Sequence, residues 1–185
     1  SPRQKTDALN RAIRRRDLDT GANRTTITFP LVVGTDTYTF ATVGNGRVFD
    51  VIGINLIFGA TRIVLQNLSF TELNVNYRPW TTYTAIPEAY CRYGPATVIF
   101  APRPNVVFST EWDVCVFSSP LVLLTDTDPM PYPYTQPVPY YAAYLCKLNE
   151  RQLDEAAEFL QAYQQLAGVA SNSRVGRVPN VYAGR

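Results

Sequence analysis

The sequence contains no histidine, and this absence removes several classes of chemistry. Without an imidazole, the chain lacks the general base of Ser-His and Cys-His catalysis and the commonest metal ligand of proteins. It also contains no phosphate-binding loop, no dinucleotide-binding glycine pattern and no zinc-ligand spacing. We therefore expect no enzymatic activity, no cofactor and no bound metal.

Cysteines and long apolar runs are also scarce. The three cysteines, Cys91, Cys115 and Cys146, are an odd number without a Cys-x-x-Cys pair, which favours buried reduced thiols over a disulfide framework. No apolar run approaches the roughly 20 residues that span a bilayer, and no signal segment is evident. We expect folding in a reducing cytoplasm and no membrane partner.

Paired carboxylates are the remaining route to hydrolysis. Glu111 and Asp113 stand two apart in a β-rich run and would share one face of a strand, where solvation is by far their commoner role. Asp126 and Asp128 could offer oxygens to Ca²⁺. However, the glycine and distal glutamate of an EF-hand loop are missing, so a turn stabilised by Asp side chains is the better interpretation.

What the chain does contain is typical of a folded protein. Of 185 residues, 46% are apolar and 17% are charged, which fits a folded chain with a real core. Fourteen prolines predict short elements joined by ordered loops, and twelve tyrosines suit either sheets or interfaces. Basic residues gather at both ends: residues 1–24 carry a net +4 and residues 168–185 a net +3, around an acidic middle. Such basic segments could bind nucleic acid or an acidic protein, and they are equally typical of solvated chain termini.

The first element predicted is a helix over residues 4–17, with apolar residues at helical spacing. Arg14, Arg15 and Arg16 fall in its expected last turn, where cations complement the helix dipole. That role is the leading interpretation of the triplet. A contact with nucleic-acid phosphates, or with another partner, is the alternative.

From residue 25 to 119 the chain is β-rich, with alternating runs and short connections that predict a largely antiparallel sheet. Asn45-Gly46 predicts a hairpin turn, and Ser69 with Glu72 predicts a capping box at a short helix. Residues 120–139 are proline-rich and favour extended geometry.

Two further helices are predicted over 140–149, with Pro139 in the first turn, and over 151–167, with Gly168 as the stop. The predicted fold is α+β: an antiparallel β-sheet or small sandwich inserted between an N-terminal helix and a C-terminal helical hairpin. Residues 1–167 would form a single domain, and residues 168–185 an extended C-terminal arm.

A relay of short motifs, continued by a Tyr/Ala-rich helix and a second helix, extends from Leu68 to Ala167 and resembles the head-to-tail adaptor (connector) proteins of tailed bacteriophages. The motifs are Leu68-Ser69-Phe70-Thr71-Glu72-Leu73, Pro79-Trp80, Pro87-Glu88-Ala89-Tyr90, Phe100-Ala101-Pro102-Arg103-Pro104, Asp126-Thr127-Asp128-Pro129 and Tyr140-Tyr141-Ala142-Ala143-Tyr144. The resemblance covers roughly 100 residues. The long Pro/Tyr loop and Cys146-Lys147-Leu148 depart from the usual pattern.

The resemblance implies a structural virion protein at the capsid-tail junction, assembled in the host cytoplasm. Its partners would be the portal protein, a tail or nozzle protein, and further copies of itself in a ring, commonly of twelve, that extends the channel for non-specific passage of double-stranded DNA. It also implies a portal-binding arm, with candidate anchors Arg174, Arg177, Val178, Pro179, Val181 and Tyr182. Two other hypotheses stay open: another neck or tail component (a tail-tube or nozzle ring, or a receptor-binding β domain), and a carboxylate-based cell-wall hydrolase.

Overall fold

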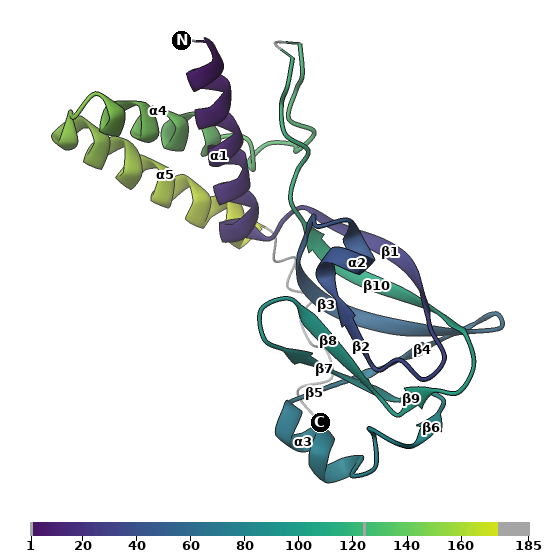
Figure 1. The fold of residues 1–185 in the computed structure, drawn as a ribbon. Coiled ribbons are helices and arrows are strands. Elements are labelled where there is room, and N and C mark those ends of the chain that lie inside the picture. The colour runs from purple at the N-terminus through teal and green to yellow at the C-terminus, as the bar shows by residue number, and fades with distance from the viewer. Residues whose placement is uncertain (1, 124, 174–185) are drawn as a thin grey trace, which may run out of the picture. The chain divides into compact units, whose positions relative to one another are not determined.

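The structure is a computed structural model that describes residues 2–123 and 125–173. Its contacts group into two compact units (Figure 1). The β unit is Arg24–Val116, and the helical unit combines the flanking stretches up to Asn23 and from Phe117. The predicted α+β class, with strands inserted between an N-terminal helix and C-terminal helices, is confirmed. The single domain over residues 1–167 stays a prediction, because grouped contacts do not test whether the units fold separately.

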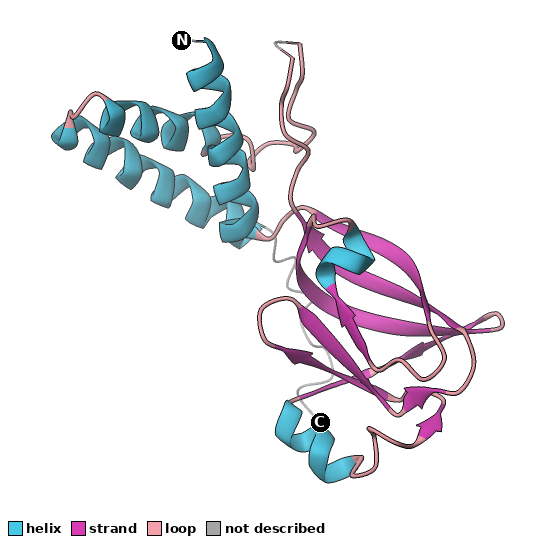
Figure 2. Cartoon of the chain, viewed as in Figure 1, coloured by secondary structure: helices cyan, strands magenta, loops and turns pink. Residues whose placement is uncertain are grey.

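Two four-stranded sheets form most of the β unit (Figure 2). The first is antiparallel throughout, in the order β1 (Arg24–Leu31), β10 (Phe108–Val116), β3 (Val48–Phe58) and β4 (Thr61–Val64). The second has the order β2 (Thr37–Thr39), β8 (Thr97–Ala101), β7 (Ala89–Tyr93) and β5 (Gln66–Leu68), with only the β5–β7 pair parallel. A short parallel pair joins β6 (Thr84–Ala85) to β9 (Arg103–Pro104).

One apolar core is shared by both sheets, as in a small sandwich. Strand β10 alternates over its first half, burying Phe108, Thr110 and Trp112 while the residues between them face outward. Trp112 is fully buried, with the rings of Phe29 and Phe100 edge-on to its indole at 6.3 and 5.6 Å. The predicted β-rich stretch thus folds around a core of aromatic side chains centred on Trp112.

Two predicted turn features have opposite outcomes. The hairpin at Asn45-Gly46 is wrong: Thr39 caps a short helix, α2 (Phe40–Gly44), and Asn45 ends it in the left-handed conformation (φ 51°), so β2 pairs with distant β8 instead of β3. The capping box is confirmed. Ser69 and Glu72 exchange hydrogen bonds at the start of α3 (Phe70–Asn76).

The helical unit contains α1 (Pro2–Thr20), α4 (Val138–Asn149) and α5 (Leu153–Ser173). Helices α4 and α5 run side by side as the predicted hairpin, and both contact α1 (Figure 1). Their core joins Ala8, Ala12 and Ile13 of α1 to Val138 and Ala142 of α4. Pro139 lies in the first turn of α4, as predicted.

Helix α5 does not stop at Gly168, so the predicted start of the arm is wrong. The helix continues to Ser173 because Ala167 and Ala170 are buried on its packed face, which offsets the weak helix propensity of glycine. Leu153, at the start of α5, is 67% exposed.

The proline-rich stretch also departs from its prediction. Residues 132–137 form consecutive turns instead of an extended run, with the Tyr134 amide donating to the Pro131 carbonyl and the Gln136 amide to the Pro133 carbonyl. Among residues 2–123 and 125–173, no helix is long and apolar enough to cross a membrane.

Candidate functional site

The three arginines of the basic triplet have three different environments. Helix α1 continues to Thr20, so the triplet lies before the last turn, and the predicted dipole role is wrong. The Arg14 guanidinium lies over the Phe117 ring, 4.3 Å from its centroid, and Arg15 pairs with Asp19 at 2.9 Å. Both side chains belong to exposed residues. A contact of Arg14 and Arg15 with DNA or a partner stays a prediction.

Arg16, in contrast, is fully buried and serves the fold. Its guanidinium donates to the Asp17 carboxylate at 2.8 Å, to the Ser118 hydroxyl at 3.1 Å and to Asp128. The other Asp17 oxygen accepts from the Ser118 amide at 2.7 Å. This network ties α1 to the chain that returns from the β unit, so Arg16 offers no free guanidinium to a partner.

The carboxylates of the first candidate pair, Glu111 and Asp113, are each held by an arginine. Glu111 and Asp113 do share the outer face of β10, as predicted. Glu111 accepts from Arg62 of β4 at 2.9 Å, while Asp113 pairs with Arg24 of β1 on the opposite side. Both acids therefore act as cross-strand ion-pair partners. Within the described residues, no group of three metal-ligating side chains comes together.

Asp126 and Asp128 stabilise turns, as predicted. Asp128 accepts from the Met130 amide, and Asp126 accepts from the amides of Val122 and Leu123 at 2.7 and 2.8 Å. The hydrogen bond from the Leu123 amide, followed by the one from the Val122 amide, holds the pKa of Asp126 below its ordinary value. The bonded pair, Val122 and Leu123, is 76% and 64% exposed, and we call it the apolar tip.

The order of the apolar tip is expected to depend on pH. Because the folded-state pKa of Asp126 is lowered, its stabilisation is complete above the ordinary aspartate pKa and is lost as pH falls through the lowered value. The Val122 and Leu123 amides should therefore lose protection from hydrogen exchange at acidic pH, when each rate is compared with the intrinsic exchange rate at the same pH. Asp126→Ala should show fast exchange at every pH. Equal protection of these amides in the variant and the parent would contradict the assignment.

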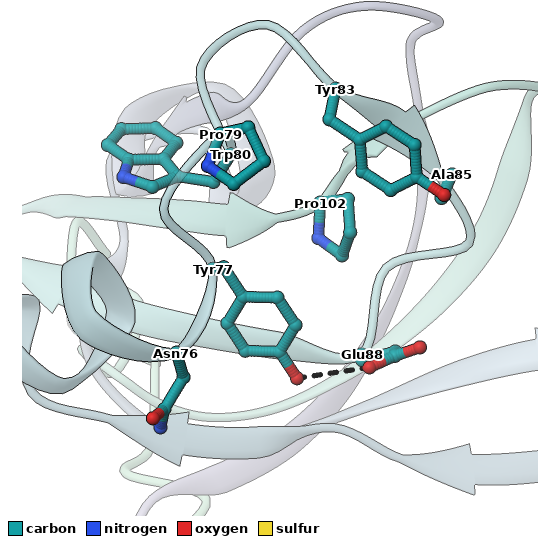
Figure 3. A pocket seen from close by; sticks show the side chains of 8 residues that line it. All are labelled: Asn76, Tyr77, Pro79, Trp80, Tyr83, Ala85, Glu88 and Pro102. Carbon is teal, nitrogen blue, oxygen red and sulfur yellow. Dashed lines mark hydrogen bonds between the residues drawn. The ribbon is translucent and has the colours of Figure 1, made fainter.

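A pocket of about 260 Å³ lies in the β unit, where α3, the following turn, β6 and the β8–β9 junction meet (Figure 3). The rings of Tyr77, Trp80 and Tyr83 and the prolines Pro79 and Pro102 form its apolar wall. Three motifs of the sequence relay meet here: Pro79-Trp80, the Pro87–Tyr90 segment through Glu88, and the Phe100–Pro104 segment through Pro102. The tertiary fold thus gives these motifs a common location that sequence spacing did not reveal.

Hydrogen bonds and ring contacts hold the pocket wall in place. The Trp80 indole N–H donates to Asn74 Oδ1 at 2.9 Å, and Phe70 packs edge-on to the same indole. The Tyr77 hydroxyl donates to Glu88 at 3.1 Å, as the dashed line in Figure 3 marks. Burial, followed by this bond, raises the pKa of Tyr77, so the phenol stays protonated at neutral pH. Glu88 itself is exposed at the rim. The sequence alone marked none of these residues as a site.

The predicted portal-binding arm lies largely outside the described residues. All six candidate anchors, Arg174, Arg177, Val178, Pro179, Val181 and Tyr182, fall in residues 174–185. The portal contact therefore stays a prediction.

The comparison with known proteins covers both units and most of the predicted arm. No curated protein matches the chain. A family model described as SU10 adaptor protein matches residues 2–182, which is nearly the whole length and includes both units and most of the predicted arm. The chain therefore belongs to the SU10 adaptor proteins, a family of phage head-to-tail adaptors.

Proposed function

We propose that this adaptor forms a ring below the portal, joins the capsid to the tail and extends the DNA channel. The observation that carries the proposal is the family match across residues 2–182. In this proposal the ring has twelve copies and lies between a portal ring above and a tail or nozzle protein below. Double-stranded DNA passes through it without sequence-specific contacts. Assembly in the host cytoplasm would precede incorporation into the virion.

The proposed portal contact is the C-terminal arm, now restricted to residues 174–185. This segment carries three arginines and no acid, so it suits an acidic portal surface. Arg174 and Arg177 would supply charge, and Val178, Pro179, Val181 and Tyr182 would supply apolar contacts.

Deleting residues 174–185 should abolish binding to the portal ring while leaving both units folded. The cut leaves helix α5 whole, whereas a cut at residue 169 would remove the buried Ala170. Binding is measured by co-sedimentation of the full chain and the deletion variant with purified portal rings, and folding by circular dichroism.

Replacing the three arginines of the arm with alanine is the matched control for charge. It should weaken portal binding and reduce its salt dependence, while the apolar anchors remain. If the deletion variant binds portal rings as the full chain does, the arm assignment is wrong. If the full chain forms rings but binds no portal, another neck or tail component is the better identity.

A further inference from the structure

The first sheet of the β unit ends in two unpaired edges. Among residues 2–123 and 125–173, β1 pairs only with β10 and β4 pairs only with β3, so these two strands lie at opposite edges of one antiparallel sheet (Figure 1). An edge strand presents a row of unpaired backbone N–H and C=O groups, and proteins usually protect such rows with charges, prolines or bulges. The two edges differ in this protection.

Strand β4 has an unprotected edge. All four of its residues are exposed, Val64 to 76% and Ile63 to 43%. The strand contains no proline and no acid, and its single charged residue, Arg62, is paired with Glu111 of β10. An exposed apolar edge without protection is a template for pairing with another chain.

The ladder between β3 and β4 shows which backbone groups β4 can offer. The Leu65 amide donates to the Ile54 carbonyl at 3.0 Å, so these two residues form a hydrogen-bonded pair. Hydrogen-bonded pairs alternate with non-bonded pairs along an antiparallel ladder. Ile63 therefore also bonds to β3, and the N–H and C=O groups of Arg62 and Val64 point away from the sheet.

Strand β1 is protected at one position only, by Pro30. This proline lies opposite Ser109 of β10, and it fits there because its nitrogen, which has no hydrogen to donate, faces away from the ladder. By the same alternation, the backbone groups of Thr26 and Thr28 also point outward, and both residues are exposed. The edge of β1 before Pro30 therefore keeps the donors that a short partner strand needs.

Strand direction decides which edge suits β4. The sheet has four strands and every pair in it is antiparallel, so β4 runs opposite to β1. A strand added antiparallel to β4 therefore has the direction of β1, and a second copy can supply it by rotation without being turned over. Such a contact is heterologous and closes into a ring when the rotation between copies allows it, whereas two β4 edges would pair about a two-fold axis and stop at a dimer.

We propose that β4 of one copy pairs antiparallel with β1 of the next copy, so that the first sheet continues from copy to copy. When Arg62 lies opposite Thr28, Val64 lies opposite Thr26, and Pro30 falls beyond the end of β4. The facing β-branched side chains would then stabilise the pair of strands. The inference rests on the proposed function, because it names the contact between copies of the proposed ring.

Disulfide trapping tests the contact directly. In a Cys146→Ser background, Val64→Cys and Thr26→Cys chains are mixed and oxidised, first alone at high concentration and then bound to portal rings. Opposed residues of antiparallel strands have Cα atoms about 4.5–5.5 Å apart, which suits a disulfide. The control mixture pairs Val64→Cys with Thr25→Cys, because Thr25 is also exposed but faces the other side of the sheet. We expect heterodimers at about tenfold the control yield, and a chain that carries both Val64→Cys and Thr26→Cys should give a ladder of higher multimers.

A proline on the edge supplies an independent test. Val64→Pro removes an outward N–H donor of β4 and leaves the bond from Leu65 to β3 in place, whereas the control Val64→Thr keeps the donor. The parent and the threonine variant should bind portal rings cooperatively, because each added copy pairs with the one before it. The proline variant should bind without cooperativity, while its urea midpoint, followed by tryptophan fluorescence, shows that the β unit is folded.

Three results would overturn the inference. The first is trapping no more frequent than the control in either setting, and the second is Val64→Cys linking mainly to itself or to the portal. The third is an equally steep binding curve for the folded proline variant. If the parent binds no portal while the free chains give the expected heterodimers, the proposed function fails and the contact between copies stands.

Discussion

Trp112→Ala is expected to destabilise the β unit by about 3–5 kcal/mol, the usual cost of truncating a large buried aromatic side chain. The indole is fully buried between Phe29 and Phe100, and its N–H donates to Thr110 Oγ1 at 2.8 Å. Its removal leaves a cavity at the centre of the core that both sheets share. No neighbouring strand can close that cavity without breaking its own pairing.

Urea denaturation followed by fluorescence measures this effect selectively. The chain has two tryptophans, Trp80 and Trp112, and both lie in the β unit, so the emission of Trp80 reports the unfolding of that unit in the variant. Trp112→Phe is the matched control and should cost less, because a ring remains in the core. If the midpoints of the alanine variant and the parent coincide, Trp112 is not the centre of the core.

Arg16→Ala is expected to destabilise the helical unit by about 3–5 kcal/mol, because it leaves a buried carboxylate without its counter-charge. Asp17 is 1% exposed and would keep only its bond to the Ser118 amide. The contacts of Arg16 with Ser118 and Asp128 would also disappear, and with them the link between α1 and the returning chain.

Circular dichroism at 222 nm measures this variant, since the three long helices belong to the helical unit. The neighbouring Arg15→Ala is the control. Its ion pair with Asp19 is half-exposed, so its loss should cost less than about 1 kcal/mol. Equal loss of stability in the two variants would contradict the distinct role of Arg16. The fluorescence midpoint separately records whether the β unit is affected.

Local sequence determined the element types and several of their ends. The capping box at Ser69 and the first turn of α4 at Pro139 depend on neighbouring residues alone, so they could be predicted. The missing histidine and the short apolar runs limit the chemistry by composition alone, whatever the fold. The motif relay pointed to the adaptor family, and the family model that matches residues 2–182 confirms it.

Contacts between distant residues decided the rest. Asn45-Gly46 has hairpin chemistry, but β2 pairs with β8, more than fifty residues away along the chain, and the turn residues end a helix instead. Gly168 is a reasonable helix stop, yet the packing of Ala170 carries α5 past it. Arg16 looks like Arg14 and Arg15 in sequence, and only burial beside Asp17 separates it from them. Spacing along the chain cannot encode these outcomes, because each depends on which surfaces meet in three dimensions.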